Sequence, residues 1–147
     1  MKIIILIPIY NDWESSIKLL ENINSEVANL GYSFSVVIVN DASTENRPEF
    51  SNSLENLRSI KILNMRENRG HGRCIATGLK YIFEKEEFDY VIPMDGDGED
   101  RPEEIKQFVD NLNYHPDKPI VGERIKRSEG MFFKFCYSIL KLLTFSF

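Results

Sequence analysis

Cysteine is scarce in this chain of 147 residues, which contains only Cys74 and Cys136. The two thiols have no metal-like spacing and form no disulfide framework, so a zinc-stapled or disulfide-stapled domain is excluded. Two isolated thiols are typical of a reduced, intracellular protein. The chain is long enough to form one domain with a hydrophobic core instead.

Basic residues are also fewer than acidic ones: the chain has 18 Lys and Arg against 23 Asp and Glu, which gives a net charge of −5. This balance gives no electrostatic reason to expect a nucleic-acid partner. Internal repeats, low-complexity tracts and Pro/Gly-rich linkers are missing, which favours a single domain. The first apolar run, 3–9, is too short for a signal peptide, contains Pro8 and lacks a small-residue cleavage site, so a buried strand is expected.

What is present is an alternation of two kinds of segment. Short β-branched runs, apolar on both faces, predict parallel strands at 3–9, 34–40, 60–65 and 89–94, with a fifth suggested at 118–123. Helical periodicity predicts helices over 13–30, 71–86 and 101–112, the first ending at Gly31 and the last beginning around Pro102. Segment 47–58 fits a short helix or a loop. The alternation predicts an α/β fold whose ligands bind beyond the carboxyl ends of the strands.

Polar residues follow the first two predicted strands. The ring of Tyr10 can stack on a base, and Asn11 and Asp12 can hydrogen-bond a sugar or phosphate, although Asp12 can equally cap the next helix. Asp41 can accept a hydrogen bond from a base N–H, or form an Asx turn.

After the third strand, a glycine-containing turn leads into a helix. Gly70 and Gly72 do not complete a G-x-G-x-x-G motif, and the chain contains no phosphate-binding P-loop motif. Arg69, His71 and Arg73 can approach a diphosphate at the helix N-terminus, or can be solvated residues of an ordinary turn.

After the fourth strand, Asp95, Asp97, Glu99 and Asp100 crowd into six positions, where they repel one another unless a cation lies among them. An EF-hand is excluded, because its sixth and twelfth positions would need Gly and Glu. A phosphatase with an aspartyl nucleophile is conceivable from the D-x-D motif, but such enzymes normally carry it after the first strand, whereas here it follows the fourth. A hard divalent cation that bridges substrate phosphates fits best. An acidic loop followed by a helix start explains Glu103 and Glu104 but not Asp95 and Asp97.

The last segment, 131–147, is rich in large apolar residues. Lys134, Ser138 and Lys141 would form one narrow polar stripe on a helix. Such a helix suits a membrane interface or packing against further protein, and the expectation is a chain truncated at its C-terminus.

Four motifs in series resemble the family 2 glycosyltransferases of the GT-A fold, particularly the branch that transfers sugars to polyprenyl phosphates. They are P-I-Y-N-D (8–12), V-N-D-A-S-T (39–44), N-R-G-H-G (68–72) and D-G-D-G-E-D-R-P-E (95–103). The resemblance covers nearly the whole chain. It implies a GT-A, Rossmann-like, mostly parallel sheet in a nucleotide-sugar-binding core over 1–125, with 126–147 beginning an acceptor or membrane region.

The resemblance also implies residue roles. Those expected at the nucleotide sugar are Pro8, Tyr10, Asn11, Asp12, Asp41 (reading the base), Gly70, Arg73 and Asp95. Those expected at a Mg²⁺ or Mn²⁺ ion are Asp95, Asp97 and Glu99, the last standing where the branch has Gln. Arg124 and Arg127 are expected to meet the acceptor phosphate. One departure is Asn40, where the family commonly has Asp.

The implied activity is metal-dependent, inverting transfer of a sugar from a UDP- or GDP-linked donor to a polyprenyl phosphate. The implied location is the cytoplasmic side of a membrane for the full-length protein, and the cytoplasm for this fragment. Two alternatives stay open: transfer to a saccharide hydroxyl in polysaccharide or cell-envelope synthesis, and a donor-binding fragment without turnover.

Overall fold

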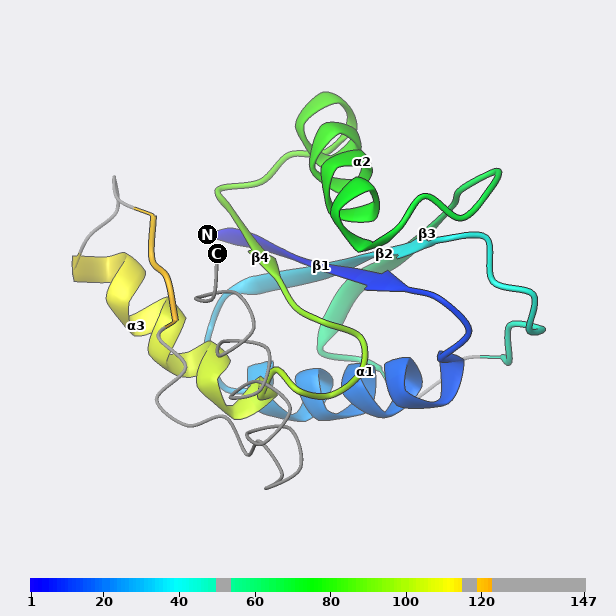
Figure 1. The fold of residues 1–147 in the computed structure, drawn as a ribbon. Helices are drawn as coiled ribbons and strands as arrows, with labels where there is room; N and C mark the ends of the chain where they lie inside the picture. Colours follow the sequence, from blue (N-terminus) through cyan, green and yellow to red (C-terminus); the bar gives the residue numbers. More distant parts are fainter. Residues whose placement is uncertain (50–53, 115–118, 123–147) are drawn as a thin grey trace, which may run out of the picture. The chain divides into compact units, whose positions relative to one another are not determined.

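The computed structural model describes residues 1–49, 54–114 and 119–122 (Figure 1). Residues 1–116 form one compact unit. Its elements are β1 (Lys2–Ile9), α1 (Trp13–Val27), β2 (Ser33–Asn40), β3 (Leu57–Asn64), α2 (His71–Lys85), β4 (Tyr90–Pro93), the 3-10 turn η1 (Pro102–Glu104) and α3 (Ile105–Tyr114).

The strands form one parallel sheet in the order β3-β2-β1-β4. β1 is central, since Ile3 is in register with Phe34 of β2 on one side and Tyr90 of β4 on the other. Parallel strands joined by helices bury both faces of a sheet, which explains the uninterrupted apolar run of β1. The predicted α/β class and the four predicted strands are confirmed.

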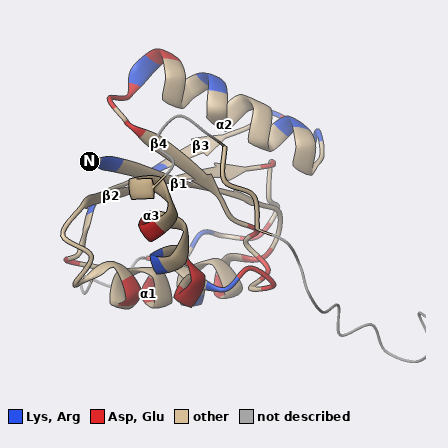
Figure 2. Ribbon diagram, turned by 90° about the vertical axis from the view of Figure 1, so that its left-hand side faces the viewer, with Lys and Arg blue, Asp and Glu red and all other residues tan. Residues whose placement is uncertain are grey.

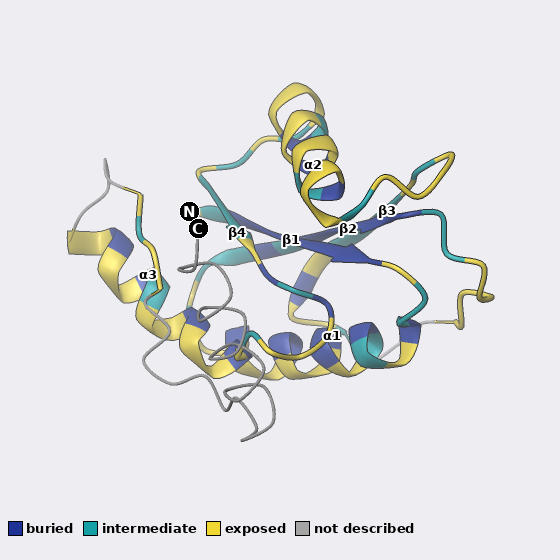
Figure 3. Ribbon diagram, viewed as in Figure 1, coloured by how far each residue is buried: buried dark blue, intermediate teal, exposed yellow. Residues whose placement is uncertain are grey.

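Alternate side chains of β1 enter two separate cores. The ribbon shows α2 on one face of the sheet and α1 and α3 on the other, with β1 buried between them (Figures 1 and 3). Ile5 and Ile7 pack with Leu20 of α1 and Ile105 of α3. Leu6 packs on the other face with residues of α2, among them Cys74 and Ile82. These two buried layers fix the sheet between α2 and the α1–α3 pair.

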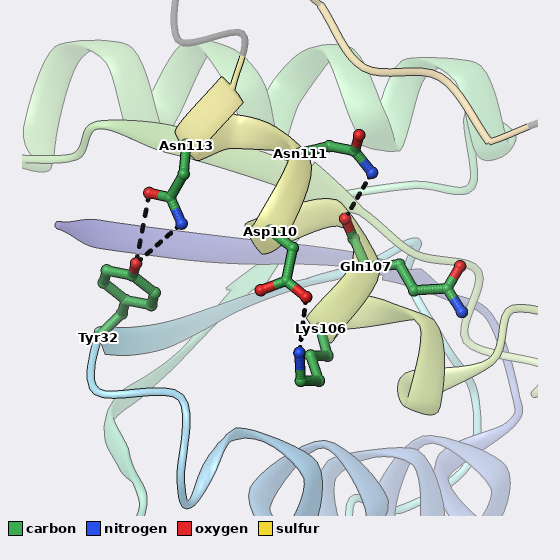
Figure 4. A network of polar contacts seen from close by, with 6 residues as sticks. All are labelled: Tyr32, Lys106, Gln107, Asp110, Asn111 and Asn113. Carbon is green, nitrogen blue, oxygen red and sulfur yellow. Dashed lines mark hydrogen bonds and ion pairs between the residues drawn. The ribbon is translucent and has the colours of Figure 1, made fainter.

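α3 is also held by polar contacts (Figure 4). The Tyr32 hydroxyl, just before β2, lies 3.2 Å from Asn113 Nδ2 and accepts a hydrogen bond from it. Lys106 and Asp110 form an ion pair of 2.6 Å one turn apart along the helix. The Asn113 contact therefore links the end of α3 to the start of β2.

Several predicted boundaries differ from the structure. α1 ends at Val27 rather than at residue 30, and Gly31 (φ +71°) ends the turn that follows it. β3 begins at Leu57, three residues before the predicted start, because its first residues pair with β2. The suggested fifth strand is wrong for its described part, since residues 119–122 form no strand. That segment has only two β-branched residues, and Pro119 has no N–H to donate to a ladder.

In the part of the chain that the structure describes, no helix is both long and apolar enough to cross a bilayer. The expected second region 126–147, with the expected amphipathic helix over 131–147, lies entirely outside the described residues.

Candidate functional site

The loops that follow β1 and β2 are joined through Asn11. Its Oδ1 accepts hydrogen bonds from the backbone N–H groups of Thr44 (2.7 Å) and Glu45 (3.2 Å), and its own N–H donates to Ser43 Oγ (2.9 Å). Asn11 adopts a positive φ of +50°, which Asn tolerates better than most residues. The two loops therefore form one connected rim at the carboxyl edge of the sheet.

The buried Asp41 carboxylate fixes the loop that leads into α2. Its Oδ1 accepts from the N–H of Arg69 and its Oδ2 from the N–H of Gly70, both at 2.7 Å. Gly70 has φ +84°, a conformation that favours glycine, and α2 begins at the next residue. Asp41 was expected to read a base; in the structure both its oxygens bind backbone, so that role stays a prediction.

Cys74 lies beneath this loop and is completely buried. Burial, and secondarily the neighbouring Asp41, raises the pKa of the Cys74 thiol to about 12. The thiol therefore stays protonated at neutral pH and behaves as a core side chain rather than as a nucleophile.

The D-G-D segment after β4 packs against the end of β1. A Cβ at Gly96 would lie 2.9 Å from Ile9 Cγ2 and 3.0 Å from the Pro8 carbonyl oxygen, so the loop approaches β1 closely. The Asp100 carboxylate accepts from the N–H of Asp95 at 2.8 Å, which supports the assignment of Asp100 to the turn. The close approach at Gly96 and this hydrogen bond set where Asp95 and Asp97 lie.

A pocket lies between the ends of β1 and β4 and the start of α2. Its lining residues are Pro8, Ile9, Tyr10, Asp12, His71, Asp95, Gly96 and Asp97. The ring of Tyr10 is about half exposed, so it presents a face to a ligand. The His71 imidazole faces the Asp95 carboxylate, with Nε2 3.4 Å from Oδ1.

The structure brings together part of the predicted site. Of the predicted donor residues, Pro8, Tyr10, Asp12 and Asp95 line the pocket, and so does Asp97, a predicted metal ligand. The alternative prediction for Asp12, a helix cap, is confirmed: its carboxylate caps α1 by accepting a hydrogen bond from the Ser15 N–H at 3.3 Å.

Other predicted residues lie elsewhere. Asn11, Asp41, Gly70, Arg73 and Glu99 are not among the lining residues, and their predicted roles stay predictions. Arg124 and Arg127 lie outside the described residues. His71 lines the pocket although the sequence pointed to it only together with Arg69 and Arg73. Its position directly after Gly70, as the first residue of the helix, was the signal that could have distinguished it from the two arginines.

The metal-binding capacity of the pocket rests on two carboxylates. In the described ranges, no three His, Cys, Asp or Glu side chains gather into a metal-holding group. Two carboxylates nevertheless suit Mg²⁺ or Mn²⁺, because such ions take one or two protein carboxylates and complete their shell with substrate phosphates and water. The residues present therefore fit a metal that arrives with a diphosphate.

Known proteins resemble the chain in sequence. It is 27% identical over 133 residues to the undecaprenyl-phosphate 4-deoxy-4-formamido-L-arabinose transferase of Proteus mirabilis, covering 90% of this chain and 40% of that protein. The protein of the same description from Salmonella paratyphi B is 26% identical, covering 97% of this chain and 42% of that protein. The chain thus spans about two fifths of the length of these relatives.

Solved structures share the fold. S. aureus TarS aligns with a TM-score of 0.59 and 22% identity, covering 87% of this chain and 24% of TarS. A TarS structure in complex with UDP-GlcNAc aligns with the same TM-score and covers 38% of that chain. This likeness confirms the predicted fold class.

The family model described as glycosyl transferase family 2 matches residues 4–141. That range contains β2, β3, β4 and β1 from Ile4 onward, together with the loops at their carboxyl ends and every residue that lines the pocket. The chain belongs to glycosyl transferase family 2.

Proposed function

We propose that this chain is the donor-binding part of an inverting glycosyltransferase that moves a sugar from a nucleoside-diphosphate sugar to a polyprenyl phosphate. The observation that carries the proposal is the pocket where Asp95 and Asp97 meet Tyr10 at the carboxyl edge of the sheet. The relatives named for transfer to undecaprenyl phosphate support the acceptor class. The TarS complex with UDP-GlcNAc supports a sugar-nucleotide donor for this fold.

Each pocket residue has a proposed task. Tyr10 stacks on the base, and Asp12 hydrogen-bonds the donor while it caps α1. Asp97 is the principal metal ligand and Asp95 lies on the nucleotide side, with Glu99 proposed as an additional ligand. Enzymes of the family generally depend on a divalent metal. Bound there, Mg²⁺ or Mn²⁺ supplies Lewis-acid stabilisation of the departing diphosphate.

The acceptor needs little activation if it is a lipid phosphate. Its second pKa near 6 leaves it anionic near neutral pH, so positioning can replace a general base. Attack on the anomeric carbon from the face opposite the diphosphate inverts that centre. We propose Arg124 and Arg127 as the groups that position this phosphate, and residues 126–147 as the start of an acceptor or membrane region at the cytoplasmic surface.

The test begins with the donor and continues with the acceptor. Thermal unfolding of the chain with Mn²⁺ and a panel of UDP- and GDP-linked sugars should show stabilisation by donors of one base. The full-length protein in membranes should then transfer the labelled sugar from that donor to undecaprenyl phosphate. Transfer to a saccharide hydroxyl instead would overturn the lipid-phosphate acceptor, and stabilisation by none of the donors would overturn the donor site.

A further inference from the structure

His71 is the basic side chain that lines the pocket. The other titratable lining residues are the acids Asp12, Asp95 and Asp97, together with Tyr10. The His71 side chain is about half exposed, and its Nε2 lies 3.4 Å from Asp95 Oδ1, at the D-x-D segment. The imidazole thus stands beside the carboxylates proposed to hold the metal and the diphosphate.

The contacts of the neighbouring backbone fix the position of His71. The Asp41 carboxylate accepts from the N–H groups of Arg69 and Gly70, the two residues directly before it. Gly70 then turns the chain through a positive φ, and Cys74, one turn into α2, is buried against the sheet. His71 is therefore held at both ends, by a buried carboxylate before it and by core packing after it.

The two arginines of the same segment are placed differently. The Arg69 guanidinium pairs with Glu67, and neither Arg69 nor Arg73 is among the lining residues. Of the three basic residues around this turn, His71 is the one that reaches the pocket.

The negative charge of the pocket explains why a hydrogen-bond donor such as the His71 imidazole would be needed in it. Three carboxylates line the pocket, and a diphosphate adds further negative charge, so its binding needs compensation. A metal at Asp95 and Asp97 supplies part of it. An imidazole N–H, on the first residue of a 15-residue helix whose N-terminus favours anions, supplies a directed hydrogen bond.

We propose that His71 donates a hydrogen bond to the diphosphate of the donor and thereby selects nucleoside diphosphates over monophosphates. Asp41 is the positioning residue that holds the backbone before it. This inference rests on the proposed donor site and names a residue within it that discriminates between ligands.

The experiment is a calorimetric titration of the chain, with Mn²⁺, using UDP and UMP and in parallel GDP and GMP. The variants are His71→Ala, His71→Gln and, as a matched control on the outer face of the same helix, Lys80→Ala. For the base that binds, His71→Ala should weaken diphosphate binding about tenfold or more and monophosphate binding less than about twofold. Lys80→Ala should match the wild type, and His71→Gln, which keeps an N–H donor, should recover much of the loss.

Other results overturn the inference at different levels. If the wild type binds UDP or GDP and His71→Ala binds it equally well, or if diphosphate and monophosphate weaken by the same factor, the role of His71 is wrong while the donor site stands. If the wild type binds neither diphosphate, the proposed function fails and the role of His71 fails with it. The variants' melting temperatures, measured without ligand, should match the wild type because His71 is half exposed.

Discussion

At the scale of single residues, the Cys74 thiol couples stability to pH. Its pKa is raised to about 12 in the folded chain, first by burial and then by Asp41. The ordinary thiol value is about 8.5 to 9, so the folded state holds this proton more tightly than the unfolded state does. The stabilisation is therefore fully present below about pH 9 and is lost as pH rises toward 12.

We expect the free energy of unfolding to fall above pH 9, by up to about 1.4 kcal/mol per pH unit for this one proton. The measurement is urea unfolding at a series of pH values in a Cys136→Ser background, which removes the second thiol. Cys74→Ser in the same background should lack this part of the slope. The raised pKa of Lys61, beside Glu86, adds its own loss at higher pH in both variants, so it cancels in the comparison. Equal slopes would contradict the assignment.

Asp41 gives a second test at this scale. Asp41→Asn replaces one carboxylate oxygen by an NH₂ group, which cannot accept from the N–H of Arg69 or Gly70. Leaving such a part-buried donor without its acceptor costs about 1–2 kcal/mol of unfolding free energy. Asp110→Asn, which breaks only the exposed ion pair with Lys106, should cost less than about 1 kcal/mol. If Asp41→Asn instead keeps the stability of the wild type but binds the nucleoside more weakly, the result would support the predicted contact between Asp41 and the base.

At the scale of elements, α2 approaches the sheet through Gly78. A Cβ there would lie 2.3 Å from Leu6 Cδ1 and 2.9 Å from Val39 Cγ2. Gly72, in the same helix, has open space around its added Cβ. We expect Gly78→Ala to lower the unfolding free energy by about 1–3 kcal/mol through overpacking. Gly72→Ala should be neutral or raise it by up to about 1 kcal/mol, because Ala favours helix. Chemical denaturation measures both, and equal effects would refute the close packing of α2.

The elements themselves were largely predictable, for a physical reason. A strand buried on both faces, such as β1, is an apolar run, and α2 repeats its buried positions at helical spacing, so both patterns are local. The start of β3 and the end of α1 were misplaced, because pairing with β2 and the turn at Gly31 decide them. The suggested strand at 118–123 was wrong over its described residues, 119–122, for the same reason, since a strand exists only with a partner.

At the scale of the whole molecule, the sequence predicted that the site lies at the carboxyl edge of the sheet, but it did not predict the individual contacts of the side chains there. Parallel strands bring their carboxyl ends together, which is why Tyr10, Asp12, Asp95 and Asp97 could be assigned to one pocket. Sequence cannot show which polar side chains are taken up by neighbouring backbone. Asn11 and Asp41 were placed at the donor, yet both hold loops together in the structure.

Charge is also distributed unevenly over the molecule. Figure 2 shows Lys and Arg along α2, while Asp and Glu predominate on α1. The pocket, with its three carboxylates, lies at the edge of the sheet next to the start of α2. A diphosphate entering it is repelled by these acids unless a cation compensates them, so metal dependence is the central claim.

The most direct test of that claim is calorimetric titration of the nucleoside diphosphate into the chain with Mn²⁺ and again with EDTA. We predict binding with Mn²⁺, loss of binding with EDTA, and loss of the Mn²⁺-dependent binding in Asp97→Asn. Glu103→Gln, an exposed acid of the neighbouring 3-10 turn outside the pocket, should bind as the wild type does. Binding that persists in EDTA and is unaffected by Asp97→Asn would contradict the account.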